Sequence, residues 1–155
     1  MYLLFNTGLI LHLCGISLMV GTTVAGFVTF RRVFAALNEN EGGVTGLMKA
    51  AKAFSKWQAL GGLFILLGGI CMMIALQGLV MEQLWFKIKL VSLVLLVFNV
   101  PVTFRPGIAR LHLFLSAGQA NPSDMIKAGK LLNIFYFVQF LLILNIFILS
   151  VFRFN

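Results

Sequence analysis

Residues Trp57–Met81 read WQALGGLFILLGGICMMIALQGLVM, and no Asp, Glu, Lys or Arg interrupts them. A helix rises about 1.5 Å per residue, so a charge-free run of this length can cross a hydrocarbon layer of roughly 30 Å. The runs Met1–Phe30 and Leu131–Phe152 have the same property. The sequence therefore predicts at least three transmembrane helices.

A fourth apolar run, Leu90–Phe104, is short if charged residues are left out. It reaches spanning length if its helix begins near Gln83 and includes Lys87 and Lys89. We therefore expect a fourth span that carries two lysines in its first half.

The composition agrees with a protein embedded in lipid. Of the 155 residues, 61% are hydrophobic and only 10% are charged, which leaves too few polar side chains to cover a water-soluble surface. The net charge of +8 lies beside the predicted spans and no motif for reading nucleic-acid bases accompanies it. The expected partner is a lipid bilayer with anionic headgroups, and nucleic acid is not expected.

Topology follows from the preference of basic residues for cytoplasmic connections. Most of the basic residues fall between the first and second spans or between the third and fourth: Arg31, Arg32, Lys49, Lys52 and Lys56, then Arg105, Arg110, Lys127 and Lys130. Both connections should be cytoplasmic and both termini non-cytoplasmic, in a multi-pass protein of the inner (cytoplasmic) membrane.

Helix ends can be placed from turn and capping residues. Pro101 and Pro106 predict a kink and then the end of the third helix. Asn121 is the expected cap of the last helix, with Pro122 and Asp124 in its first turn. The sequence thus predicts an all-α, single-domain integral membrane four-helix bundle, with helices at about 2–33, 47–80, 83–105 and 122–153.

One face of the first helix gathers Gly8, His12, Gly15 and Met19 at helical spacing. Small residues let either a neighbouring backbone or a flat cofactor approach His12. Neutral imidazole is a common axial ligand of haem, so His12 is the candidate haem iron ligand, with Gly15 and Met19 lining the cofactor. The alternative is that His12 only forms a hydrogen bond with a neighbouring helix.

The third helix gathers its polar side chains on one face in the same way: Trp85, Lys89, Ser92, Leu96, Asn99 and Thr103. Lys89 should therefore point into the protein, at a cost of about 3 kcal/mol or more unless it is paired or hydrated. We place Lys89 and His12 at a similar depth, about 10 to 15 Å below the outer surface, where they would face one another. In the alternative, Lys89 reaches up to the outer headgroups; Lys87, on another side of the helix, is given no chemical role.

Short motifs along the chain support a resemblance. They are Leu11-His12, Gly21 and Arg31-Arg32-Val33-Phe34 at the first helix, Trp85-Phe86-Lys87-Ile88-Lys89-Leu90 at the third, and Leu132-Asn133 at the last. In order and spacing the chain resembles the HemJ type of protoporphyrinogen IX oxidase and its wider group of small four-helix membrane proteins, which includes CopD-like domains.

The resemblance implies that His12 binds haem b and that Lys89 is needed for activity. It also implies porphyrinogen as substrate, with electrons passed to a membrane acceptor such as a quinone. The chain departs from the family at Lys87, where a histidine is usual, and at Arg31, where a proline is usual. It also has Met19 and Phe27 near positions where the family has a Trp and a Tyr.

A non-enzymatic function stays open beside this one. The chain would then be a small subunit or scaffold of a larger membrane assembly, or a homo-oligomer, with its glycine pairs and Phe-rich faces as contact surfaces. A metal or solute transporter is disfavoured because no acidic residue lies within the spans. Cys14 and Cys71 are expected to be buried small residues, and His112 a polar residue of a loop.

Overall fold

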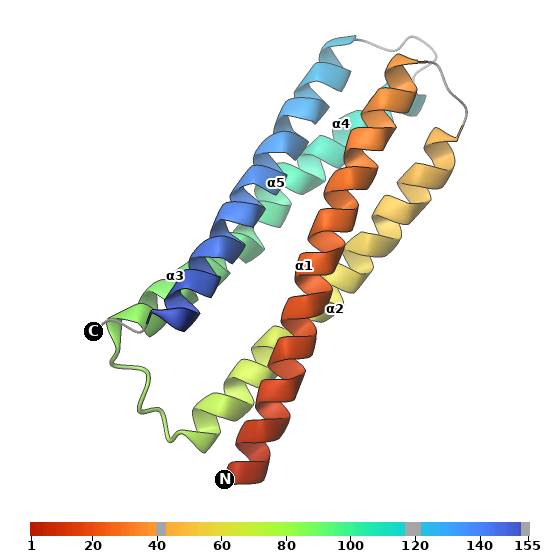
Figure 1. Ribbon diagram of the computed structural model, residues 1–155. Coiled ribbons are helices and arrows are strands. Elements are labelled where there is room, and N and C mark those ends of the chain that lie inside the picture. Colours follow the sequence, from red (N-terminus) through yellow and green to blue (C-terminus); the bar gives the residue numbers. More distant parts are fainter. Residues whose placement is uncertain (40–42, 117–121, 153–155) are drawn as a thin grey trace. The chain divides into compact units, whose positions relative to one another are not determined.

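The computed structural model describes residues 1–39, 43–116 and 122–152. Four helical spans are long and apolar enough to cross a membrane, which confirms the predicted all-α class and the number of spans. The chain divides into two compact units, which we call unit 1 (Met1–Glu82) and unit 2 (Gln83–Asn155). Each unit is built on a pair of antiparallel helical spans (Figure 1). The side of the membrane that holds the termini stays a prediction.

Unit 1 is a hairpin of α1 (Tyr2–Asn38) and α2 (Val44–Ala75) held together by glycines. A Cβ atom added to Gly15 would lie 2.7 Å from the Gly61 carbonyl oxygen, and one added to Gly68 would lie 2.6 Å from the Gly8 carbonyl oxygen. No real side chain fits at such distances, so the two backbones are in direct contact. Gly8 and Gly15 are seven residues apart on α1, and Gly61 and Gly68 are seven residues apart on α2. This spacing keeps the contacts on one face of each helix.

Helix α2 ends at Ala75, five residues before the predicted end near residue 80. The chain turns there because Gln77 and Gly78 have positive φ values of 53° and 73°. A glycine adopts this backbone conformation without strain, and Gln77 shares the turn with it. The apolar sequence continues through this turn, which is why hydropathy alone extends the helix too far.

The third span of the chain is longer than predicted. It consists of α3 (Leu84–Asn99), a π-helical turn η1 (Val100–Phe104) and α4 (Arg105–Ser116), which follow one another without a break. The prediction that this helix stops near residue 105 is wrong. The wide π turn takes in Pro101, and Pro106 is the second residue of α4, directly after that turn.

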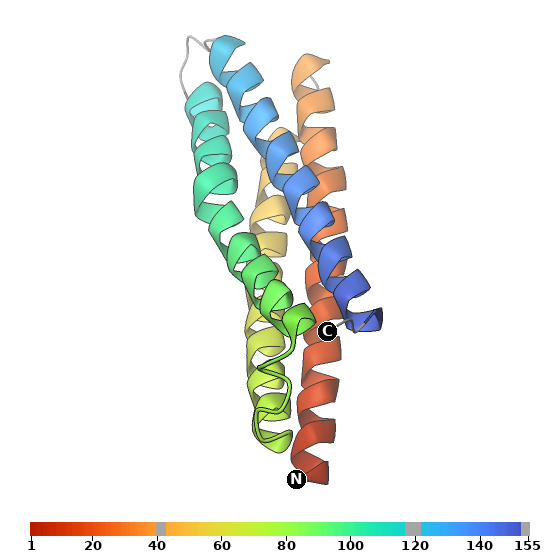
Figure 2. The same cartoon turned by 90° about the vertical axis from the view of Figure 1, so that its left-hand side faces the viewer.

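Helix α5 (Pro122–Val151) runs antiparallel to this long span (Figure 2). The predicted acidic residue of its first turn, Asp124, lies 3.4 Å from Arg110 of α4. The core of unit 2 includes Leu111, Leu132 and Phe135, each 1% exposed. The predicted cap Asn121 and the predicted end at residue 153 lie outside the described residues.

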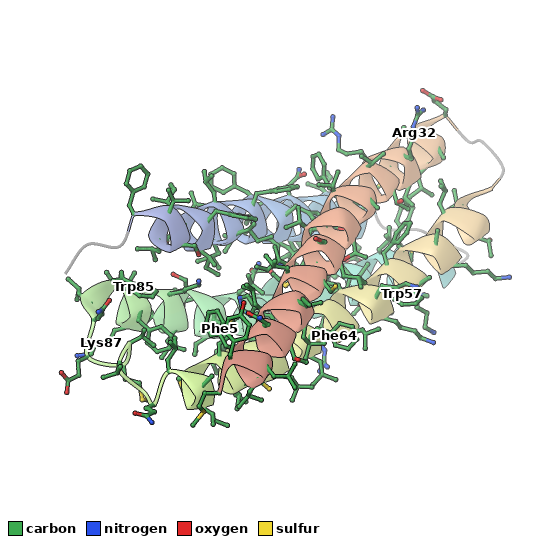
Figure 3. All side chains as sticks on the ribbon, turned by 60° about the horizontal axis from the view of Figure 1, so that its bottom comes forward. Phe5, Arg32, Trp57, Phe64, Trp85 and Lys87 are labelled. Carbon is green, nitrogen blue, oxygen red and sulfur yellow. The ribbon has the colours of Figure 1, made fainter. Side chains whose placement is uncertain are left out.

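Two smaller predictions are wrong, that Cys14 is buried and that His112 lies in a loop. Cys14 is exposed, because it lies on a side of α1 turned away from α2, while Cys71 is half-buried. His112 lies on the exposed side of α4 rather than in a loop, since the helix continues past Pro106. Figure 3 shows the side chains of both units, with the exposed Arg32, Trp57 and Lys87 labelled.

Candidate functional site

His12 forms a hydrogen bond across unit 1. Its Nδ1 lies 2.9 Å from the backbone carbonyl oxygen of Ile65. A carbonyl can only accept, so Nδ1 is the protonated nitrogen and donates to Ile65. In a neutral imidazole the lone pair is then on Nε2, which is the tautomer of a histidine that binds a metal through Nε2.

The glycines of α2 bring His12 into this position. A Cβ atom on Gly68 would lie 2.7 Å from the backbone nitrogen of His12 and 2.9 Å from its Cα. The backbone of α1 therefore passes directly over Gly68, and the imidazole reaches along α2 to the Ile65 carbonyl. A larger residue at position 68 would push the histidine away from its acceptor.

The other two predicted cofactor-binding residues share this face of α1, as expected from their spacing. Gly15 is buried against Gly61 and Ile65, so helix packing accounts for the glycine. Met19 is 6% exposed, and its carbonyl accepts the Thr23 hydroxyl at 2.7 Å. The cofactor-binding roles of Gly15 and Met19 stay predictions.

In each of the two glycine pairs of α2, only the first glycine contacts α1, a difference that the sequence did not reveal. Gly61 and Gly68 contact α1, whereas a Cβ atom on Gly62 would meet nothing within 4 Å. A Cβ atom on Gly69 would meet only the His12 Nδ1, at 3.9 Å. We call Gly62 and Gly69 the open glycine face; of the two, Gly69 lies beside the imidazole.

In unit 2, Lys89 contacts the end of α5. Its ammonium donates to the Ser150 hydroxyl oxygen at 2.8 Å, and Ser150 in turn donates to the Ile146 carbonyl at 2.7 Å. Because Ser150 lies in the last turn of α5, the Lys89 nitrogen lies level with that turn. Lys87 is exposed, in agreement with its predicted outward position.

The predicted polar face of the third helix is confirmed. Ser92, Leu96 and Asn99 are all buried. Ser92 donates to Asn145 at 3.1 Å, and the Asn99 amide donates to the Phe135 carbonyl at 3.0 Å. We call these contacts between α3 and α5, together with the Lys89–Ser150 bond, the polar seam.

The polar residues of α5 differ in their contacts. Asn145 and Gln139 contact α3 and belong to the polar seam. Tyr136 is buried, and its ring lies 5.0 Å from that of Phe135, its neighbour on the same helix. Asn133 is exposed and has no hydrogen-bond partner in the part of the chain that the structure describes.

His12 and Lys89 belong to different units, and the prediction that they face one another stays a prediction. At about 1.5 Å per residue, His12 lies about 15 Å from the start of α1, and Lys89 lies about 8 Å from the start of α3.

A haem is compatible with the residues around His12 in one respect. Haem iron needs one or two axial protein ligands, and the tautomer of His12 provides a nitrogen lone pair for such a bond. Within residues 1–39, 43–116 and 122–152, no three His, Cys, Asp or Glu side chains gather in a group that could hold a metal ion.

The chain was compared with protein-family models, with curated proteins and with solved structures. None of the three comparisons gave a match.

Proposed function

We propose that this chain is a haem b-binding membrane redox protein of the HemJ type, with His12 as an axial ligand of the haem iron. The observation that carries the proposal is the Nδ1 hydrogen bond of His12 to the Ile65 carbonyl. Such a bond fixes the ring orientation of a metal-binding histidine and increases the basicity of its other nitrogen. A bound haem would supply one-electron redox chemistry there.

The open glycine face supports the proposal further. Gly69 leaves the surface of α2 without a side chain beside the imidazole, and a porphyrin is a flat ligand. A side chain at position 69 would stand between the helix backbone and a ring bound at His12. The role of the face is thus to admit the ring edge, while Gly61 and Gly68 hold α1 in place.

For Lys89 we propose a role in binding a carboxylate of a porphyrinogen or a haem propionate. The Ser150 hydroxyl holds the ammonium at the end of α5, which limits how far the long side chain can move. An ammonium with low-dielectric surroundings attracts a carboxylate strongly. Lys89 would then position the substrate through that carboxylate.

The oxidation of a porphyrinogen to a porphyrin releases electrons and protons together, so it needs an acceptor. A quinone dissolved in the bilayer takes up both and is the acceptor we propose. We further propose that the protein lies in the inner membrane with both termini outside the cytoplasm, since most basic residues fall in the two connections expected on the cytoplasmic side.

Absorption spectra of the purified protein test the proposal. The protein is expressed with ample haem precursor, purified in mild detergent and measured in oxidised and reduced forms. We expect a stoichiometric b-type spectrum that is lost in His12→Ala and kept in His112→Ala, which removes the exposed histidine of α4. A well-folded wild-type protein without haem would refute the proposal.

The role of Lys89 has a matched control in the same helix. Lys89→Ala should reduce porphyrinogen oxidation at least tenfold while the haem spectrum remains, and Lys87→Ala, which alters an exposed lysine, should leave the rate unchanged. Equal rates in both variants would contradict the role of Lys89.

A second candidate is a non-enzymatic subunit of a larger membrane assembly or a homo-oligomer. It is favoured by large exposed aromatic side chains on the outer faces of unit 2: Phe98 is 60% exposed and Phe137 is 70% exposed. Lipid or another protein can cover such faces. This candidate predicts a colourless protein that purifies as a complex, and the same spectra distinguish it from the first.

A further inference from the structure

Three lysines in the first half of α2 form one exposed face of the helix. Lys49, Lys52 and Lys56 are all exposed, and no acidic residue lies between them. Their spacing of three and then four residues keeps them within about 60° of one side of the helix. At about 1.5 Å per residue, the row is about 10 Å long. We call these three residues the lysine stripe.

The lysine stripe has no acidic partner in its own helix or in the helix packed against it. Neither α1 nor α2 contains an Asp or a Glu, and no ion pair involves the stripe in the part of the chain that the structure describes. Like charges three or four residues apart repel one another and destabilise a helix. The exposed lysines of α5, Lys127 and Lys130, instead share their helix with Asp124. An external anion would relieve the repulsion within the stripe.

The register of unit 1 relates the depths of residues on its two helices. Gly8 lies against Gly68 and Gly15 lies against Gly61, so seven steps along α1 match seven steps back along α2. The first charge-free run of the sequence ends at Phe30. Continued to that residue, the same register places Phe30 level with the first turn of α2.

The two helices set two limits for the edge of the hydrocarbon layer. On α2 the charge-free segment begins at Trp57, which is 54% exposed and of a residue type enriched at membrane interfaces. On α1 the charge-free run continues to Phe30 and exposes Val24 and Val28, by 45% and 53%. The edge lies between these limits, in an interval of about 16 Å along α2. The whole lysine stripe falls in this interval and is therefore at the depth of lipid headgroups.

We propose that the lysine stripe binds the phosphate group of an anionic phospholipid. A lysine ammonium donates up to three hydrogen bonds, and its flexible chain reaches toward the headgroup layer. The net negative charge of an anionic headgroup offsets the repulsion within the stripe, whereas a zwitterionic headgroup carries its own cation. The proposal is independent of haem binding.

Quenching of the fluorescence of Trp57, the residue next to the stripe, tests the proposal. In the full chain with Trp85→Phe, Trp57 is the only tryptophan. The protein is reconstituted in vesicles of equal parts phosphatidylglycerol and phosphatidylcholine, and each lipid in turn carries bromine, a quencher, on its acyl chains. We expect phosphatidylglycerol to be about fivefold enriched over phosphatidylcholine beside Trp57. Equal quenching by the two lipids would overturn the proposal and show that the stripe is a solvated surface.

Two double variants of exposed lysines remove equal charge from different units. Lys52→Gln with Lys56→Gln should lower the enrichment at least about twofold, whereas Lys127→Gln with Lys130→Gln should leave it unchanged. Lys52→Arg with Lys56→Arg keeps the positive charge and should retain most of the enrichment. The same decrease in both glutamine variants would show that the lipid responds to the net charge of the protein alone, and would overturn the assignment to the stripe.

Discussion

Single residues in this protein act through the backbone of the helix opposite them. His12 binds the Ile65 carbonyl, Asn99 binds the Phe135 carbonyl, and Gly68 lies against the backbone of α1. The sequence identifies these three residues by their spacing. It does not identify their partners, because every residue has a carbonyl group and no letter of the sequence marks the one that is used.

At Gly68, we expect a Cβ atom to separate the helices of unit 1. Gly68→Ala should lower the free energy of unfolding by about 1–3 kcal/mol, because the added atom would lie within 2.6 Å of the Gly8 carbonyl oxygen. Gly62→Ala is the matched control, since nothing lies within 4 Å of that site and alanine favours a helix. Unfolding by steric trapping in bicelles measures both. Equal losses would show that α1 and α2 do not touch at Gly68.

A similar comparison is available between two asparagines. Asn99→Leu removes the bond to the Phe135 carbonyl and the contact with Gln139, and should cost about 1 kcal/mol, the usual scale of hydrogen bonds between membrane helices. Asn133→Leu should be neutral or stabilising, because Asn133 is exposed on α5. The same unfolding assay applies, and a larger loss at Asn133 would contradict the assignment of the polar seam.

Among the elements, the helix interiors are predictable from sequence and several helix ends are not. Charge-free runs locate the four spans, and the helical spacing of Ser92, Leu96 and Asn99 locates the buried face of α3. The failure at Pro101 has a physical cause. A proline does not stop a helix when the turn that contains it widens, and this widening cannot be seen in the local sequence.

The pairing of α4 with α5 should depend little on its ion pair. Arg110 and Asp124 lie 3.4 Å apart, but their side chains are 41% and 30% exposed, so water screens the attraction. We expect Asp124→Asn to change the free energy of unfolding by less than about 1 kcal/mol. By contrast, Leu132→Ala in the core beside it should cost about 2–5 kcal/mol, since Leu132 is 1% exposed. A large effect of Asp124→Asn in the unfolding assay would mean that the pair is better shielded than its exposure indicates.

At the scale of the whole molecule, the chain is a succession of two units, each with its own interhelical hydrogen bonds. The predicted topology in the membrane rests on charge. The basic residues Arg31, Arg32 and Lys49 cluster around the connection between α1 and α2, whereas the connection between α2 and α3 carries only Glu82 as a charged residue. This asymmetry can be predicted from the sequence, because it depends on which charged residues each connection contains and not on how the helices pack.

Cysteine labelling in intact cells tests the topology. In a background without Cys14 and Cys71, Glu82→Cys should react with a membrane-impermeant thiol reagent, and Glu39→Cys should react only after the cells are opened. The two sites should differ because α2 is a single span between them. The reverse labelling pattern would place the termini in the cytoplasm and contradict the proposed orientation.

The contacts that position His12 have a consequence for the biogenesis of the protein. The histidine, the Ile65 carbonyl and all four contact glycines lie in unit 1, so the nascent chain contains them before α3 has been synthesised. Because chains are made from the N-terminus, this hairpin can pair as soon as α2 leaves the ribosome and enters the bilayer. The imidazole is then oriented at an early stage of membrane insertion, before the second half of the protein is made.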